Sequence, residues 1–315
     1  MDSRLRGNDE IWRSFLQSKR VIIFTDEPEK QGSWHGAQLA SALTLRGVDA
    51  VFVSLQDCVI DLSGSAPSIQ LPNFNGLPKV AFVRGIAGGT LQQITTRLSI
   101  LHMLKMQGVL IYNDAHAIER TVDKAMTSFL LHHAGIATPK TWVCESRHAA
   151  HHIINQHSKT VLNNAVINKM VIKPLFGSQG QGVRLVNTAL PLPGDRFVDG
   201  VFYMQQFIAA KHDYRIFIVN NQVLAAMRRT GEGWLHNVAQ GAQCDAINDT
   251  DVFDIALKAA LKLDIAYCGV DVIRDVDGQL LVLEVNSIPA WRGLQSVIKI
   301  DIAQALADDV LRQLS

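Results

Sequence analysis

Two stretches near the C-terminal end of the chain alternate apolar and polar residues, as β-strands do. Asp271 lies in the first stretch, Glu284 and Asn286 lie in the second, and the turn Asp275–Gly278 between them ends in Asp-Gly. Such a turn between two alternating stretches predicts an antiparallel hairpin. The hairpin would bring two carboxylates and a carboxamide to one face, and hard oxygen ligands of this kind suit Mg²⁺. The pattern therefore predicts two paired strands with a metal site on one face.

The first part of the chain alternates short apolar stretches with longer helix-forming ones. We expect strands at residues 21–25, 50–53, 80–83 and 109–112, and helices at residues 34–45 and 91–106. Strands that alternate with helices predict a parallel α/β arrangement. Residues 20–113 are therefore expected to form an N-terminal α/β domain, preceded by a loose tail at residues 1–19.

The chain becomes rich in strands after residue 114, with spacings typical of antiparallel hairpins. We expect helices at residues 122–133, 251–263 and 300–314, and strands at residues 141–144, 170–173, 183–186, 201–208, 214–219, 223–228, 267–273 and 280–285. The pair Asn220-Asn221 suits a hairpin turn. The whole chain is thus predicted to be of the α/β class. Its second domain, residues 114–315, divides into a central lobe at about 114–200 and a C-terminal lobe at about 201–315.

Composition limits the function classes. The 315 residues are 48% hydrophobic and 19% charged, which is typical of a globular protein. A formal net charge of +1 gives no long-range attraction to nucleic acid or to an anionic membrane. The four cysteines form no C-x-x-C pair and resemble reduced thiols, and no apolar run is long enough to cross a membrane. We expect a cytoplasmic protein with no nucleic-acid and no membrane partner.

Lys173 stands just before a glycine-rich segment that contains Gly177, Gly180 and Gly182. Closely spaced glycines let the backbone approach a ligand and present its N–H groups to phosphate oxygens. The lysine would add a positive charge at the start of this loop. An ordinary tight hairpin has the same pattern, and neither the Walker motif nor the dinucleotide fingerprint is present.

Two further basic residues are candidates for a binding site. Lys124 begins a predicted helix, where a solvated lysine is the alternative interpretation. Arg215 shares a strand face with Phe217 and Val219, so its guanidinium must reach a cleft or an anion. No Gly-x-Ser-x-Gly elbow occurs, and we expect no acyl-enzyme chemistry.

Taken in order, these motifs resemble the ATP-grasp superfamily and, within it, the RimK-like carboxylate–amine ligases. The resemblance covers about residues 113–315, and each motif alone is less specific than the order in which they occur. It is carried by Asp123-Lys124, Gly135–Thr141, Lys173-Pro174, Gly177–Val183, Gln205–Ile208, Asp213–Arg215, Ala226–Arg229, Asn237 with Gly241, Gly269–Asp271 and Glu284–Pro289. The α/β lobe before them fits the domain that usually precedes an ATP-grasp module.

The resemblance implies a role for each matching residue. ATP would be bound by Lys124, Lys173, Gly177, Ser178, Gln179, Gly180, Gly182, Gln205, Gln206, Phe207, Ile208 and Asp213. Mg²⁺, or Mn²⁺ in its place, would be held by Asp271, Glu284 and Asn286. Arg215, Arg229 and Asn237 would be catalytic and steady the transferred phosphoryl group.

Three positions depart from the usual pattern of these ligases. Gln206 stands where a glutamate is common, the segment around Asn237 lacks the usual His-Arg pair, and Pro289–Gly293 replaces a Pro-Gly start. The last two departures lie where the family binds its acceptor and amine substrates. They leave ATP use intact and put the identity of the substrate in doubt.

The resemblance implies an ATP-dependent ligase that joins a carboxylate to an amine through an acyl phosphate. Glutamate or another amino acid would be added to a cofactor, small molecule or peptide, and a tetrahydromethanopterin-type cofactor is one candidate acceptor. A homo-oligomer is expected. A non-catalytic ATP-binding regulatory protein and a small-molecule kinase are the alternatives. The complete set of Asp271, Glu284 and Asn286 argues against the regulatory protein.

Overall fold

The structure is a computed structural model that describes residues 20–157, 159–162, 165–177, 182–186, 192, 194, 199–231, 233–234 and 242–314. The predicted tail at residues 1–19 and the site residues Ser178, Gln179, Gly180 and Asn237 lie outside these ranges. The described chain forms two compact units. The first comprises residues 20–116, 290–292 and 300–314, and the second comprises residues 117–289 and 293–299. Within the described residues, no helix is both long and apolar enough to span a bilayer.

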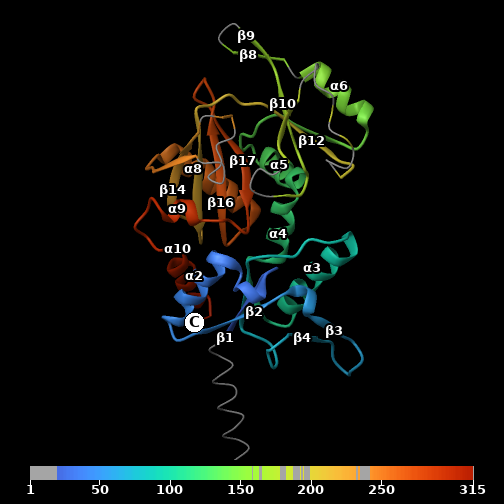
Figure 1. The fold of residues 1–315 in the computed structure, drawn as a ribbon, viewed down its shortest axis with the longest axis vertical. Coiled ribbons are helices and arrows are strands. Elements are labelled where there is room, and N and C mark those ends of the chain that lie inside the picture. Colours follow the sequence, from blue (N-terminus) through green and yellow to red (C-terminus); the bar gives the residue numbers. More distant parts are fainter. Residues whose placement is uncertain are drawn as a thin grey trace, which may run out of the picture. The chain divides into compact units, whose positions relative to one another are not determined.

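The first unit is built around a parallel four-stranded sheet with the order β2-β1-β5-β6. Its strands are β1 (Arg20–Phe24), β2 (Asp49–Val53), β5 (Val80–Val83) and β6 (Leu110–Tyr112). The two central strands are apolar along most of their length because both faces of a parallel sheet are buried. Helix α2 (Ser33–Thr44) links β1 to β2, and α3 (Leu91–Met106) links β5 to β6 (Figure 1). A small antiparallel pair, β3 (Val59–Asp61) and β4 (Ser68–Gln70), precedes β5.

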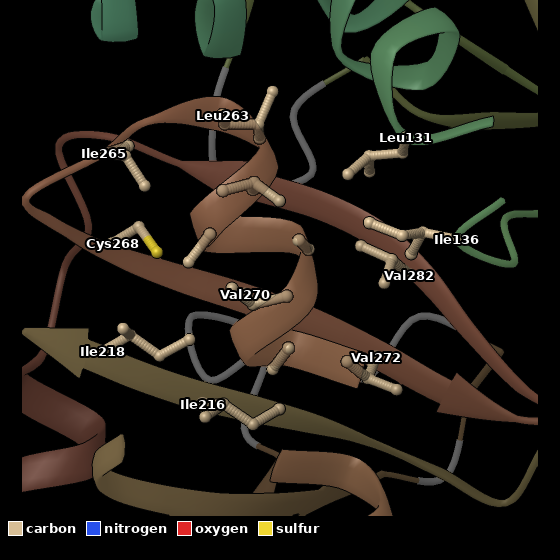
Figure 2. Close-up of a cluster of buried hydrophobic side chains, with 14 of the residues drawn as sticks. Leu131, Ile136, Ile216, Ile218, Leu263, Ile265, Cys268, Val270, Val272 and Val282 are labelled. Carbon is tan, nitrogen blue, oxygen red and sulfur yellow. The ribbon is translucent and has the colours of Figure 1, made fainter. Parts of the chain in front are cut away.

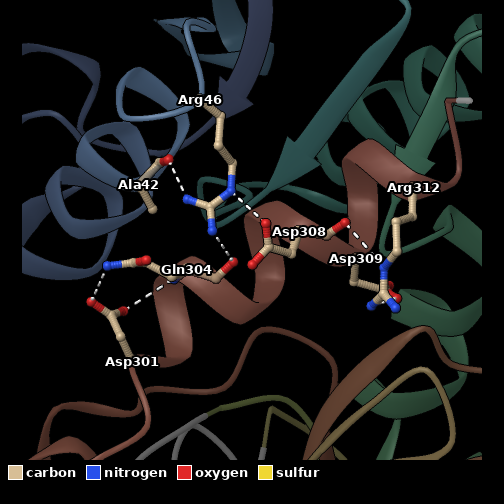
Figure 3. A network of polar contacts seen from close by, with 7 residues as sticks. All are labelled: Ala42, Arg46, Asp301, Gln304, Asp308, Asp309 and Arg312. Carbon is tan, nitrogen blue, oxygen red and sulfur yellow. Dashed lines mark hydrogen bonds and ion pairs between the residues drawn. The ribbon is translucent and has the colours of Figure 1, made fainter.

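The last helix of the chain, α10 (Ile302–Arg312), packs against α2 in this first unit. Arg46, just after α2, donates to the Asp308 carboxylate at 2.6 Å and to the carbonyl oxygens of Ala42 and Gln304 (Figure 3). The apolar side of α10 is buried, which is why residues 300–314 belong to the first unit although they follow the strand-rich region in sequence. The sequence division at residue 113 stays a prediction.

The second unit contains two antiparallel sheets. The four-stranded sheet has the order β11-β10-β12-β7, with β7 (Thr141–Cys144), β10 (Met170–Lys173), β11 (Arg184–Val186) and β12 (Phe202–Gln206). Met170, Ile172 and Met204 lie on one face and pack with Ala150 and Ile154 of α6 (Arg147–His157). The opposite face carries polar side chains. A hairpin of β8 (Lys159–Leu162) and β9 (Ala165–Asn168) follows α6.

The five-stranded sheet has the order β15-β14-β13-β16-β17. Its strands are β13 (His212–Val219), β14 (Gln222–Thr230), β15 (Gln243–Ala246), β16 (Tyr267–Arg274) and β17 (Leu280–Asn286). One face packs under α8 (Thr250–Leu263) and α5 (Lys124–His133), where Ile216, Val270 and Val272 form a buried core (Figure 2). The other face carries Arg215 and Asp271 beside the buried Phe217.

Most predicted elements are present, and the differences have local causes. The predicted helix 122–133 is α5, which begins at Lys124 because the Asp123 carboxylate accepts from the backbone N–H groups of Ala125 and Met126 and caps the helix. The predicted strand 201–208 ends at Gln206, where the pairing with β10 and β7 stops. Both residues of the predicted Asn220-Asn221 turn have positive φ, as the turn requires. Several elements were not expected, namely α4 (Ala115–Val122), α6, the short helix α9 (Arg292–Gln295) and strands β3, β4, β8, β9 and β15.

Candidate active site

The predicted hairpin is confirmed as β16 and β17. Asp271 pairs directly with Glu284, and Gly269 pairs with Asn286. The pairing shifts by one residue after Asp271, which leaves Leu283 as the extra residue of a β-bulge. The bulge matters because side chains alternate in a regular strand, so Val282 and Glu284 would otherwise share a face. With the bulge, Val282 lies in the core and Glu284 lies on the face of Asp271.

Four charged residues form a buried network on this polar face. The Arg215 guanidinium donates two hydrogen bonds to Asp271, one of them from Nη2 to Oδ2 at 2.9 Å. Arg229 donates to both carboxylate oxygens of Asp213, at 2.7 and 2.9 Å, and lies 3.2 Å from Asp271 Oδ2. The strand pairing explains the contacts, because Arg215 lies opposite Asp271 and Arg229 lies opposite Asp213.

Burial and charge act against each other in this network. Burial raises the pKa of Asp213 to about 6, even though Arg229 lowers it. Burial would also raise the pKa of Asp271, but Arg215 and Arg229 together hold it below its usual value. The pKa of Arg229 is raised, because Asp271 and Asp213 outweigh the effect of burial. Asp271 is thus an ionised carboxylate held by two guanidinium groups.

Gly269 provides the space for this arrangement. A Cβ atom at this position would lie 3.0 Å from Cβ of Pro289 and 3.1 Å from Nη1 of Arg215. Both contacts are tighter than ordinary van der Waals packing. The glycine of the Gly269–Asp271 motif therefore allows the arginine to lie across the strand beside its carboxylate partner.

The two predicted lysines lie close enough to Glu284 for its charge to act on both. Burial lowers the pKa of Lys124 and of Lys173, and Glu284 opposes both shifts. Lys173 at the end of β10 donates to the Gln205 side-chain oxygen at 2.8 Å, and Lys124 donates to the carbonyl oxygens of Leu175 and Gly177. The structure thus brings two lysines from separate elements to the acidic hairpin, which the sequence alone left open.

Glu284 and Asn286 differ from Asp271 in their surroundings. Both are half-buried, and neither side chain has a hydrogen-bond or ion-pair partner among the residues that the structure describes. Two free oxygen ligands beside two lysines suit a magnesium ion with bound phosphates. Asp271 can join them only through lone pairs that its two arginines leave available. Its role as a metal ligand stays a prediction.

The predicted hinge segment divides into two parts. The Gln205 side chain is buried on the polar face of the four-stranded sheet, where its amide donates to Thr141 Oγ1 at 3.2 Å and to the Tyr203 hydroxyl at 3.3 Å. Gln206 is half-buried at the end of β12, and Phe207 and Ile208 follow the strand. The Phe207 ring packs edge-on against Trp234, with centroids 6.1 Å apart. Backbone contacts of this segment with adenine stay a prediction.

Sequence reasoning missed Tyr203, which accepts a hydrogen bond from Gln205, the partner of Lys173. Tyr203 shares a strand face with Gln205 and lies opposite Lys173, so strand alternation could have indicated it. Its hydroxyl also lies 2.8 Å from Ser128 Oγ of α5. Of the predicted phosphate loop, Gly177 and Gly182 are described, and both have positive φ, which glycine adopts without strain.

Solved structures establish the class of fold. The ATP-grasp ligase PsnB, complexed with a minimal precursor, aligns over 94% of this chain and 99% of its own, with a TM-score of 0.70 and 19% identity. The RimK domain ATP-grasp protein from Sphaerobacter thermophilus aligns over 93% of this chain and 99% of its own, with a TM-score of 0.63 and 22% identity. The fold is therefore that of the ATP-grasp proteins.

The sequence comparisons narrow this class to a family. The model of the RimK-like ATP-grasp domain matches residues 121–310. A tetrahydromethanopterin:alpha-L-glutamate ligase from Methanococcus maripaludis is 32% identical over 93% of this chain and 98% of its own length. The chain belongs to the RimK-like ATP-grasp family and is an ATP-grasp ligase.

Proposed function

We propose that this ligase uses Mg-ATP to join the amino group of glutamate to a carboxylate of an acceptor molecule. The observation that carries the proposal is the placement of Lys124 and Lys173 around Glu284 on the polar side of the second unit. Two cations beside two free oxygen ligands match the charges of a nucleotide's phosphates and their metal ion. Mn²⁺ in place of Mg²⁺ and a homo-oligomeric state stay predictions.

The chemistry needs positioning and charge neutralisation more than a nucleophilic side chain. An acceptor carboxylate oxygen attacks the γ-phosphorus of ATP, and the bond from that phosphorus to the β,γ-bridging oxygen breaks to release ADP. The amine nitrogen then attacks the acyl carbon, phosphate leaves with the bonding electrons, and the nitrogen loses a proton to form the amide. Lys124 and Lys173 would hold the phosphates, and Glu284 and Asn286 would hold Mg²⁺, which offsets charge on the phosphate oxygens.

The arginine network has a separate part in this proposal. Arg229 is buried and already bonded to Asp213 and Asp271, so it serves to position its neighbours. Arg215 is slightly more exposed and carries further N–H donors beyond the two that Asp271 accepts. Arg215 would therefore be the arginine that steadies the transferred phosphoryl group.

The curated relatives suggest the two substrates. The relative from Methanococcus maripaludis is named for tetrahydromethanopterin and L-glutamate, and one from Hahella chejuensis, 27% identical over 88% of this chain and 91% of its own, is named a probable alpha-L-glutamate ligase. Glutamate is common to both names, which supports it as the amine. Tetrahydromethanopterin is the first acceptor to test.

A phosphate-release screen tests the proposal. The protein is given Mg-ATP with each of a panel of acceptors, namely tetrahydromethanopterin, small carboxylic acids and peptides, and with each of the common amino acids. Phosphate and ADP are measured, and products are weighed by mass spectrometry. We expect release that requires both an acceptor and glutamate, with a product heavier by one glutamyl residue. A stable phosphorylated acceptor formed without any amine would overturn the proposal in favour of a kinase.

A further inference from the structure

Two consecutive helices of the chain, α3 and α4, carry three side chains that the proposed ligase reaction does not use. His102 lies near the end of α3, and His116 and Glu119 lie on α4. One imidazole nitrogen of each histidine and one carboxylate oxygen of Glu119 all lie within 4.8 Å of one another. No second group of this kind, able to hold a metal ion, occurs among the residues that the structure describes. These three side chains are therefore the place to look for a metal site outside the candidate active site.

The sequence of α4 places two of these ligands on one side of the helix. His116 and Glu119 are three positions apart, and helical residues with this spacing face the same way. A glutamate and a histidine at this spacing supply metal ligands in helical bundles. The Asp114 carboxylate accepts from the backbone N–H of His116 at 2.9 Å, which fixes the start of the helix. Both ligands are thus presented from the first turns of a capped helix.

An ion pair holds α3 beside the start of α4. Lys105, three positions after His102 and so on the same side of α3, lies 2.6 Å from Oδ2 of Asp114. The His102 and His116 rings meet with centroids 4.5 Å apart and planes inclined by 53°. These four residues belong to the first unit, and Glu119 follows His116 by one turn of the same helix. The ion pair therefore fixes the two helix segments that carry the imidazole rings.

The exposure of the three side chains allows an ion to reach them. His102 and Glu119 are half-buried, whereas His116 is exposed. The two half-buried ligands are held in place by their neighbours, and the exposed imidazole can rotate between staggered conformations. An ion from solvent could therefore be bound without a rearrangement of the backbone.

Two imidazoles and one carboxylate suit a transition metal better than Mg²⁺. Imidazole nitrogen binds ions such as Zn²⁺, whereas Mg²⁺ prefers oxygen ligands. Zn²⁺ takes histidine nitrogen and glutamate oxygen at about 2.0–2.2 Å in a tetrahedral arrangement, so its ligand atoms lie about 3.3 Å apart. Small side-chain rotations would bring atoms that already lie within 4.8 Å to this separation. Three protein ligands leave the fourth position of the ion for water.

We propose that His102, His116 and Glu119 bind one Zn²⁺ ion. The ion would join α3 to α4 beside the ion pair of Lys105 and Asp114. Its binding free energy would add to the stability of the folded chain, because the unfolded chain does not hold the three ligands together. None of the three side chains is among the residues proposed for ATP, for Mg²⁺ or for the phosphoryl group. The zinc site therefore does not depend on the proposed ligase function.

Zinc titration of the whole protein tests the proposal. The protein is dialysed against a chelator and then titrated with Zn²⁺ in excess Mg²⁺, which competes for the predicted magnesium site. We expect one tightly bound Zn²⁺ per chain by calorimetry and a melting temperature that rises with Zn²⁺ concentration. His102→Gln, His116→Gln and Glu119→Gln should each weaken Zn²⁺ binding on the order of a hundredfold, because even the loss of a residue that only orients a metal ligand costs about 10–100-fold.

His148→Gln is the matched control, because the exposed His148 and His152 lie one turn apart on α6, a spacing that can also bind zinc. This variant and Glu284→Gln, which alters the predicted magnesium site, should bind Zn²⁺ as the wild type does. In chelator, His116→Gln should melt at the wild-type temperature, since its side chain is exposed. Absence of a tight Zn²⁺ site, wild-type binding by His116→Gln or Glu119→Gln, or loss of binding in either control would each overturn the proposal.

Discussion

The two faces of the five-stranded sheet are built from alternate residues of the same strands, yet they obey opposite rules. On one face Ile216, Val270 and Val272 are buried against α8 with no polar atom among their side chains. On the other face Arg215 and Asp271, the immediate neighbours of Ile216 and Val270, are held by charge and hydrogen bonds. Burial of the apolar face away from water stabilises the fold. Burial of charged groups on the polar face destabilises it unless each charge has a partner.

The four-stranded sheet repeats this division. Ile172 and Met204 pack under α6, while Lys173, Tyr203 and Gln205 point to the other side. Two sheets with one helix-covered face each can present two polar faces to a ligand. The comparison predicts that substitutions on the polar faces change activity and that substitutions on the apolar faces change stability.

The largest expected effect is a loss of activity without a loss of stability, caused by substitutions on the polar faces. Lys173→Ala and Glu284→Gln should each reduce ADP formation by about a thousandfold or more, because each removes charge that acts on the phosphates or metal. The melting temperature should change little, since both side chains are only half-buried. Lys140→Ala, which removes an exposed lysine beside the same sheet, is the matched control. Wild-type turnover in either variant would contradict the assignment of the site.

A substitution in the buried ion network should reduce both activity and stability. Asp271→Ala leaves Arg215 and Arg229 facing each other without their shared carboxylate. Breaking a buried pair in this way costs about 3–5 kcal/mol of unfolding free energy. Urea denaturation and ADP formation should therefore both show a loss. Unchanged stability would mean that the network is open to water.

Ile216→Ala should affect only stability. The side chain is fully buried beneath α8, so its truncation leaves a cavity that costs about 2–5 kcal/mol. Activity per folded molecule should stay near that of the wild type, which can be measured at low temperature after the folded fraction is determined. A selective loss of activity would show that the two faces are mechanically coupled.

A smaller effect is expected on the pH dependence of stability, because a histidine is partly buried in the first unit. His35 binds a proton near pH 4 when folded and near pH 6.5 when unfolded, so the unfolded chain binds more protons between these values. Stability should therefore fall as pH falls from 6.5 to 4, by about 1–2 kcal/mol after allowance for the partly exposed ring. His35→Gln should flatten this dependence in tryptophan-monitored unfolding. His133→Gln, an exposed control, should leave it unchanged.

Much of the site could be predicted because its signals are local. The Asp-Gly turn and the alternation around Asp271 and Glu284 were enough for the hairpin, and the order of the lysine and glycine motifs was enough for the family. The network between Arg229 and Asp213 could not be predicted, because it depends on which strands pair and in which register. The contacts among Trp34, Arg84 and Trp291 join three distant parts of the chain, so no sequence spacing connects these residues.

The sequence by itself determined the elements, the order of the motifs and the residue types that can bind phosphate and metal, because these depend on local pattern and chemistry. Only the tertiary structure decided that Leu283 is a bulge, that Asp271 is shared by two arginines, and that α10 returns to the first unit. Each of these outcomes depends on how separate elements pair or pack. In each, the chain balances the burial of apolar surface against the need to give buried charges a partner.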